Sequence, residues 1–267
     1  MIFDITSLQN PRIKHVVKLR EDKRQRQRDQ LFLVEGRDEL DHAFSAGFLP
    51  QTIFTAPDLT THQLTFPAAE TIRVNRTVFG KISYRENPDG WLGLFPIPSR
   101  SLDNVLLSSS PLLIIAESVE KPGNLGAILR TADAARADAL LLCDPRVDLW
   151  NPNVVRASRG ALFSVPAVEV NSASALAWLK ARRIQILAAT PAASVSYTSL
   201  DYVKPVAIAV GTEDTGLSEF WLEHADEKMS IPMLGRVNSL NVSIATAVII
   251  YEAIRQRRMS QPFISPG

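Results

Sequence analysis

The second part of the chain alternates short, continuously apolar segments with stretches of helical periodicity. Segments of strand length and apolar composition lie at 112–116, 139–143, 166–170, 184–188 and 206–210. Helices are predicted over 124–136, 174–183 and 242–258. Strands that are apolar throughout are typical of a parallel sheet covered by helices on both faces. The pattern therefore predicts an α/β domain whose ligands bind beyond the carboxyl ends of its strands.

The first hundred residues have a different pattern. Short runs of β-rich composition lie at 31–34, 52–55 and 91–95, with helices predicted near 38–46 and 76–82. A small α/β domain fits this spacing.

A proline-rich stretch over 95–101 follows, and its prolines favour extended backbone, which is typical of a linker. We therefore expect a first domain over 1–96, a linker over 97–107 and a second domain over 108–267. The chain length of 267 residues allows two domains of this size.

The composition excludes several classes of protein. The single cysteine, Cys143, rules out an intramolecular disulfide framework, a thiolate zinc site and an iron–sulfur cluster, and its apolar neighbours predict a buried thiol. The four histidines show no metal-ligand spacing, so no metal is expected. No apolar stretch approaches the ~18 residues of a transmembrane helix, and no signal peptide is apparent. A cytoplasmic protein without membrane contact is expected.

The net charge of +1 conceals a basic run. Residues 12–28 contain eight Lys or Arg against two acids. The candidate phosphate contacts are Arg12, Lys14, Lys18, Arg20, Lys23 and Arg24. Such a run is typical either of a solvated helix face or of a surface that neutralises phosphates, and the run alone does not decide between them.

The first candidate loop follows the strand predicted at 112–116. Asn124 is placed to cap the next helix, Gly126 permits close backbone approach in its first turn, and Arg130 projects near the same end. A capped helix with a surface arginine is the alternative interpretation.

The second candidate loop, 211–218, follows the strand predicted at 206–210. Two glycines, Gly211 and Gly216, bracket the acids Glu213 and Asp214. The Gly-Lys-Ser/Thr ending of a phosphate loop is missing, and adjacent acids repel phosphate. The loop is therefore either a simple strand-to-helix turn or a cradle for a ribose or an adenine.

The third candidate loop spans 231–243 and places polar residues in an apolar region. These are Asn238, Ser239, Asn241 and Ser243. Ser239 or Asn241 fits a helix N-cap, but one cap does not account for four polar residues that we expect to be half-buried. Buried polar groups need partners, and a ligand is one such partner.

In this order, the three loops resemble the SpoU (TrmH-type) branch of the SPOUT RNA 2′-O-ribose methyltransferases. The motif Asn-x-Gly-x-x-x-Arg is matched by Asn124, Gly126 and Arg130, and Gly-x-Glu-x-x-Gly-Leu-Ser by the residues from Gly211 to Ser218. The third motif is matched by Ile231-Pro232-Met233 and by Ser239-Leu240-Asn241-Val242-Ser243. Residues 7–14 and 32–36 resemble the substrate-binding domain that precedes the catalytic domain in this family.

The resemblance implies a fold, a cofactor and a partner. The second domain is expected to be a parallel sheet with a deep trefoil knot, and the first a small RNA-binding domain similar to a ribosomal-protein fold. The family binds S-adenosyl-methionine in the knot and works as a homodimer. Cofactor contacts are expected at Thr190, Gly211, Glu213, Gly216, Ile231, Met233, Ser239 and Leu240. No thiol or metal takes part in the implied chemistry.

The implied reaction is methyl transfer to a ribose 2′-hydroxyl in RNA. Catalytic roles are expected for Arg130, Asn124, Ser239, Asn241 and Glu213. By resemblance, Arg130 activates the hydroxyl. Since a guanidinium holds its proton tightly, anchoring a phosphate or stabilising an oxyanion is an equally open role.

Three alternative functions share some of these features. One is a non-catalytic RNA-binding relative, which the intact motif residues disfavour. Another is a dehydrogenase-like enzyme, which lacks support because no Gly-x-Gly-x-x-Gly follows a strand. The third changes only the substrate to transfer RNA, whereas the separate first domain favours ribosomal RNA.

Overall fold

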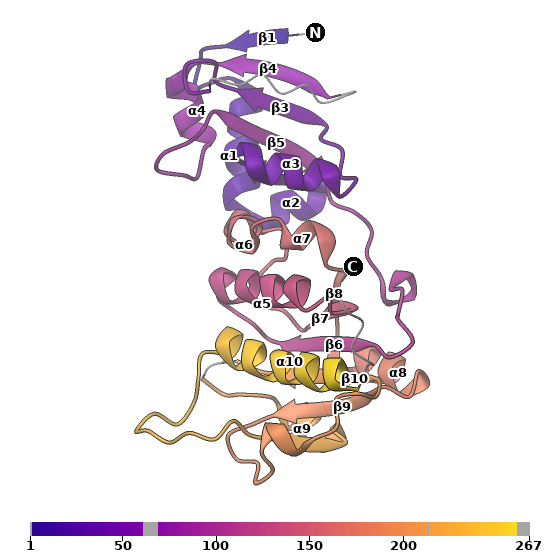
Figure 1. The fold of residues 1–267 in the computed structure, drawn as a ribbon. Helices are drawn as coiled ribbons and strands as arrows, with labels where there is room; N and C mark the ends of the chain where they lie inside the picture. The colour runs from indigo at the N-terminus through magenta and orange to yellow at the C-terminus, as the bar shows by residue number, and fades with distance from the viewer. Residues whose placement is uncertain (1, 61–68, 213, 261–267) are drawn as a thin grey trace, which may run out of the picture. The chain divides into compact units, whose positions relative to one another are not determined.

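The computed structural model describes residues 2–60, 69–212 and 214–260, and the chain divides into two compact units (Figure 1). The first unit consists of Met1–Ser99 and Asp148–Ser164, and the second of Arg100–Val147 and Val165–Gly267. The first unit thus includes a segment from the middle of the range 108–267.

The second unit is built on a parallel sheet in the order β11-β9-β10-β6-β7-β8. Its strands are β6 (Leu112–Glu117), β7 (Ala139–Cys143), β8 (Ala167–Val170), β9 (Gln185–Ala189), β10 (Val206–Val210) and β11 (Glu227–Met229). Every residue of β6, β7 and β10 is buried, as their continuous apolar sequence predicts. The predicted parallel sheet is confirmed, and only the three-residue strand β11 was not predicted.

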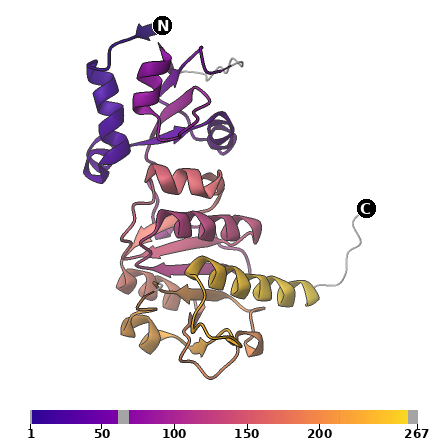
Figure 2. The same ribbon diagram turned by 90° about the vertical axis from the view of Figure 1, so that its left-hand side faces the viewer.

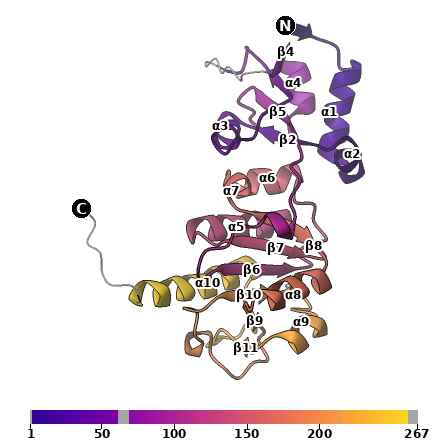
Figure 3. The same ribbon diagram turned by 90° about the vertical axis from the view of Figure 1, so that its right-hand side faces the viewer.

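Helices cover both faces of this sheet. They are α5 (Pro122–Ala134), α8 (Ser172–Ala181), α9 (Glu219–His224) and α10 (Val242–Met259). Helices α5 and α10 lie side by side on one face (Figure 2), and α8 and α9 cover the other (Figure 3). Short 3-10 turns, η1 (Leu102–Asn104) and η2 (Tyr197–Ser199), lie in the connections. The predicted helices are confirmed within a few residues at each end, whereas α9 was not predicted.

The single cysteine belongs to the core of the second unit. Cys143 is fully buried at the end of β7, among the side chains that the sheet packs against α8. Burial raises the pKa of its thiol well above the ordinary value. The prediction of a buried thiol is confirmed.

The first unit is a five-stranded mixed sheet in the order β1-β4-β3-β5-β2. Its strands are β1 (Ile2–Ile5), β2 (Leu31–Glu35), β3 (Thr52–Thr55), β4 (Glu70–Val74) and β5 (Trp91–Pro96). Its own helices are α1 (Pro11–Glu21), α2 (Lys23–Asp29), α3 (Arg37–Ser45) and α4 (Arg76–Ile82). The small α/β domain is confirmed, whereas the strands β1 and β4 and the helices α1 and α2 were not predicted.

A Glu-Gly pair at the end of β2 forms a dense polar junction in this unit. Glu35 is fully buried and accepts hydrogen bonds from Ser83 Oγ (2.5 Å) and Tyr84 N (2.9 Å). Burial raises the pKa of its carboxyl group. Gly36 has φ +109°, and a Cβ there would lie 2.3 Å from the Arg85 guanidinium. Only glycine fits this position.

Two short helices from the middle of the chain complete the first unit. Helices α6 (Pro152–Ser158) and α7 (Ala161–Ser164) were not predicted, and α6 packs on β2. The rings of Phe32 and Trp150 have centroids 4.5 Å apart. The side chain of Arg26 pairs with Asp148, the first residue of the segment 148–164 that contains both helices, with Nε–Oδ2 at 2.8 Å and Nη2–Oδ2 at 2.7 Å. The segment is therefore held by both aromatic packing and a buried ion pair.

Within the described ranges, no helix combines the length and the apolar character needed to cross a bilayer.

Candidate functional site

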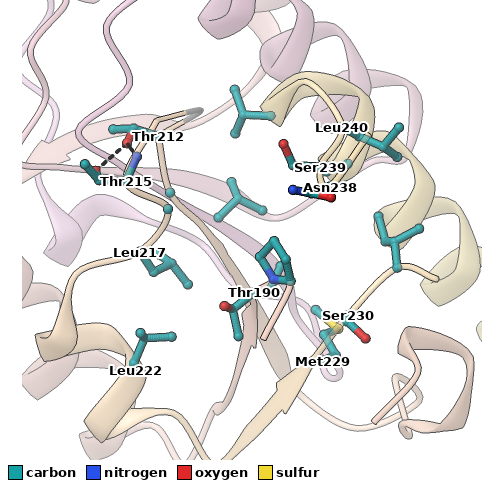
Figure 4. A pocket seen from close by; sticks show the side chains of 18 of the residues that line it. Thr190, Thr212, Thr215, Leu217, Leu222, Met229, Ser230, Asn238, Ser239 and Leu240 are labelled. Atoms are coloured by element: carbon teal, nitrogen blue, oxygen red, sulfur yellow. Dashed lines mark hydrogen bonds between the residues drawn. The ribbon is translucent and has the colours of Figure 1, made fainter. Parts of the chain in front are cut away.

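A cavity of about 420 Å³ opens at the carboxyl ends of three neighbouring strands, β9, β10 and β11 (Figure 4). The last residue of each strand, Ala189, Val210 and Met229, lines it. Ligands of α/β proteins bind at this end of the sheet, and the volume lies in the range of small-molecule sites. The second and third candidate loops supply most of the remaining wall.

The second loop is closed tightly at its base. Thr212 and Gly216 exchange two backbone hydrogen bonds, of 3.0 and 3.1 Å, and the hydroxyls of Thr212 and Thr215 lie 2.8 Å apart (Figure 4). A Cβ on Gly211 would lie 2.1 Å from the backbone of Gly216, which itself has φ +69°. Both glycines are therefore required by the backbone of the loop, independently of any ligand.

The end of this loop is bound to the central strand. Ser218 donates from its backbone N–H to Glu117 Oε2 (2.7 Å) and from its hydroxyl to Glu117 Oε1 (2.6 Å). Glu117, the last residue of β6, is only 7% exposed. We did not predict its contribution, although an acidic residue at the end of an apolar strand was a usable signal.

The third loop connects to the first through two asparagines. Asn241 caps α10, accepting hydrogen bonds from Ser243 N (3.0 Å) and Ser243 Oγ (2.6 Å), and its Nδ2 donates to Asn124 Oδ1 (3.2 Å). Asn241 is thus a structural cap and a link between two motifs. Asn238 and Ser239 are exposed rather than half-buried, so burial does not explain their polarity.

The prediction that Asn124 caps its helix is wrong. Helix α5 begins earlier, at Pro122, and the capping position belongs to Lys121. Proline suits the first turn of a helix because its missing N–H has no partner to lose there. Asn124 consequently lies within the first turn, where its side-chain oxygen accepts a hydrogen bond from Asn241.

Tyr202 connects Met229, the cavity residue of β11, to helix α10. The buried Tyr202 donates from its hydroxyl to Tyr197 O (2.7 Å) and contacts Met229 Sδ at 3.1 Å. Its backbone N–H donates to Gln256 Oε1 (3.1 Å), and its carbonyl accepts from Arg257 Nε (2.8 Å). Burial raises the pKa of the Tyr202 hydroxyl. No pattern in the sequence indicates this support.

The predicted contact residues gather around this one cavity. Those that line it are Thr190, Gly211, Gly216, Ile231, Met233, Ser239 and Leu240. Glu213 lies outside the described residues. Arg130 is exposed on α5, does not line the cavity and makes no ion pair with any residue that the structure describes.

The basic run of the first unit is only partly free for a ligand. Arg26 is buried, and Arg20 donates to Lys81 O (3.0 Å) and Ser83 O (2.6 Å). Arg12 pairs with Glu70 at 2.7 Å.

Of the exposed cations of the run, Arg12 and Arg28 pair with Glu70 and Asp29, which leaves Lys14, Lys18 and Arg24, while Lys23 is half-buried. These four side chains form no ion pair with other described residues. The surface available to phosphates is therefore smaller than the composition of the run indicates. In the part of the chain that the structure describes, no group of three or more His, Cys, Asp or Glu is placed to hold a metal.

The fold and the cavity define an α/β protein with a small-molecule site at the carboxyl end of a parallel sheet and a separate, partly basic α/β unit. Residues 111–251 match the SpoU rRNA Methylase family, and residues 10–93 match the MRM3-like substrate binding domain. The chain belongs to the SpoU rRNA methylase family.

Individual relatives agree with this assignment. The chain is 33% identical over 187 residues to the 23S rRNA (uridine(2479)-2'-O)-methyltransferase of Streptomyces viridochromogenes, covering 68% of this chain and 65% of that one. It is 32% identical to an uncharacterized tRNA/rRNA methyltransferase of Synechocystis, slr1673, covering 96% and 95%. The AdoMet-bound rRNA methyltransferase from Sinorhizobium meliloti has a similar structure, with a TM-score of 0.87 and 30% identity over 98% of this chain and 99% of that one.

Proposed function

We propose that this protein transfers a methyl group from S-adenosyl-methionine to a ribose 2′-hydroxyl in ribosomal RNA. The observation that carries the proposal is the gathering of six motif residues, together with Thr190, around one cavity at the carboxyl ends of β9, β10 and β11. Membership of the SpoU family and the names of the relatives, which specify 23S rRNA and 2′-O-methylation, support it. Transfer RNA is the alternative substrate.

The side chains around the cavity fit the cofactor. Leu217, Ile231 and Leu240 supply apolar surface for an adenine, while the hydroxyls of Thr190 and Ser239 can bond to a ribose. The carboxylates that line the cavity are Asp214 and Glu219. Carboxylates suit the amino group and the sulfonium of this donor. The cofactor would supply an electrophilic methyl group.

The first motif would bring the ribose to that methyl group. Asn124, fixed by Asn241, can orient the attacking 2′-oxygen, and Arg130 lies six residues further along the same helix. As the 2′-hydroxyl loses its proton, negative charge develops on its oxygen. An exposed guanidinium can stabilise that oxygen or hold an adjacent phosphate. Alignment of the reacting atoms is the main contribution expected from these residues.

The proposal also includes a knot and a homodimer. Segments 211–218 and 231–242 would form a deep trefoil knot, as the family resemblance implies. An apolar stripe on α10, with Ile244 53% exposed and Tyr251 52% exposed, supports a second copy as partner. Ribosomal RNA as substrate implies a cytoplasmic location.

A binding and transfer assay tests the proposed function. The wild-type protein is expected to bind S-adenosyl-methionine in calorimetry with one site per chain. It should transfer radiolabelled methyl to ribosomal RNA from cells that lack the protein, and not to RNA from cells that contain it. Methylation of transfer RNA alone would replace the substrate in the proposal. Absence of cofactor binding would overturn the enzymatic function.

Neutralising the exposed part of the basic run should weaken RNA binding. We expect the triple variant Lys14→Gln, Lys18→Gln, Arg24→Gln to bind RNA more weakly. The variant contacts fewer phosphates, and RNA binding therefore releases fewer counterions. The slope of log K against log salt should fall by about 0.7–0.9 for each contact removed. Filter binding at several salt concentrations measures this slope.

A charge-matched control keeps the test specific. The variant Lys180→Gln, Lys204→Gln, Lys228→Gln removes the same charge from the second unit and should leave the slope nearly unchanged. Equal slopes for the wild type and the first-unit variant would identify the basic run as a solvated helix face.

A further inference from the structure

Glu117 joins two loops that are a hundred residues apart in the sequence. Both of its carboxylate oxygens accept hydrogen bonds from one residue, Ser218, at 2.7 and 2.6 Å, and the glutamate is 7% exposed. Charge-assisted hydrogen bonds in a buried setting are stronger than neutral ones. The position of Ser218 is therefore determined by the central strand β6 rather than by its own loop.

The hydroxyl of Ser218 bonds to Glu117 and does not cap helix α9. Ser218 occupies the N-cap position of α9, where a serine oxygen usually accepts a hydrogen bond from the first turn, yet its side chain makes no such bond. Its hydroxyl donates to Glu117 instead. The contact thus stabilises the connection to β6 and not the start of the helix.

Fixing Ser218 also fixes part of the cavity wall, because the two residues before it line the cavity. Gly216 and Leu217 line the cavity, and Gly216 is paired with Thr212 across the base of the loop. Since Gly211 packs directly against Gly216, a shift at the end of the loop moves both sides of its base. Holding Ser218 therefore holds this wall of the cavity.

We propose that Glu117 is a positioning residue that keeps the end of the second loop, residues 214–218, in the conformation that binds the cofactor. Glu117 does not line the cavity, so it acts through Ser218. Glu117 also begins the loop that leads to Asn124, so its contact with Ser218 connects the first motif to the second. The hydrogen bond between Asn241 and Asn124 connects the first motif to the third. This inference rests on the proposed function, because it takes the cavity to be the cofactor site.

The neighbouring strand offers a matched control. Asp144 follows β7 and accepts hydrogen bonds from Ser172 N (3.1 Å) and Ser172 Oγ (2.6 Å), which is the same chemistry at the start of another helix. Neither residue lines the cavity. Asp144 has φ +48°, so alanine there adds backbone strain to the lost hydrogen bonds. The control variant therefore removes the same two hydrogen bonds and adds backbone strain, but at an exposed carboxylate where Glu117 is buried.

Cofactor affinity distinguishes positioning from general stability. For Glu117→Ala we expect the Kd of S-adenosyl-methionine in calorimetry to rise about tenfold, since fewer molecules hold the competent loop conformation. Ser218→Ala should show a smaller rise, and Asp144→Ala should stay within about twofold of the wild type. Glu117→Gln should recover most of the affinity. Its amide oxygen can accept from Ser218 N, while the serine hydroxyl accepts from its NH₂.

Kinetics and amide exchange complete the test. In Glu117→Ala, the KM for the cofactor should rise while kcat at saturation stays within about threefold, because bound cofactor restores the loop. The amides of Thr212 and Gly216 should exchange faster than in the wild type and in Asp144→Ala.

Three results would overturn the positioning role: an unchanged exchange rate, equal cofactor losses in the Glu117 and Asp144 variants, or a loss confined to kcat. The exchange measurement needs no cofactor. It therefore still decides the role of Glu117 if the wild type fails to bind S-adenosyl-methionine and the proposed function falls.

Discussion

Replacing Arg130 with alanine is expected to lower the rate of methyl transfer by about 100- to 1000-fold, the usual cost of removing a group that stabilises developing charge. Cofactor affinity should stay close to that of the wild type, because Arg130 does not line the cavity. Single-turnover transfer of radiolabelled methyl, with calorimetry in parallel, measures the two quantities separately.

Two further variants sharpen this prediction. Arg130→Lys keeps the charge but not the planar fork, so partial recovery would indicate stabilisation by charge, and no recovery would indicate bidentate anchoring. Lys180→Ala removes an exposed cation from α8, on the opposite face of the sheet, and should leave transfer unchanged. Turnover of Arg130→Ala at the wild-type rate would contradict the assignment of this residue.

Removing Asp148 is expected to destabilise the protein by about 3–5 kcal/mol, because it leaves the guanidinium of Arg26 buried without its counter-ion. The side chains of the pair are 2% and 8% exposed. Arg26 also donates to Leu19 O (2.6 Å), and Asp148 accepts from Trp150 N (3.0 Å). Urea unfolding of Asp148→Ala, followed by fluorescence and circular dichroism, gives the free energy of unfolding.

An exposed pair in the same unit provides the control. Arg12 and Glu70 are 50% and 33% exposed at the side chain, so Glu70→Ala should cost less than about 1 kcal/mol. The double variant Arg26→Met, Asp148→Leu should recover much of the loss, since it leaves no buried charge. A cost below about 1 kcal/mol for Asp148→Ala would show that the pair does not hold the segment 148–164 to its unit.

Local pattern was enough to predict most of the sheet and to select residues that gather around one cavity. Strands β7 and β10 and helix α4 lie at the predicted residues. The motif residues that we assigned to the cofactor line one cavity wherever the structure describes them. This succeeded because apolar continuity, glycine spacing and motif order are properties of short stretches of sequence.

Elements that are short or stabilised from a distance were not predicted. Strand β11 has three residues, two of them exposed and charged, and carries too little periodicity to be recognised. Helix α6 packs on β2, which lies more than a hundred residues earlier in the chain, and the ring of Phe163 in α7 contacts that of Phe32 in β2. Helix propensity depends on neighbouring residues and does not reflect a contact with a distant strand.

The sequence by itself determined the parallel α/β sheet, the order of the three motifs and the burial of the single cysteine. Only the tertiary structure decided which polar residues are structural. In the basic run, Arg20 binds backbone carbonyls and Arg26 binds a carboxylate, so neither is available to a phosphate. Asn124 bonds to Asn241 instead of capping α5, and Glu117 fixes Ser218. The physical reason is that desolvation and hydrogen-bond partners depend on groups that approach from distant parts of the chain, and composition and spacing do not record that approach.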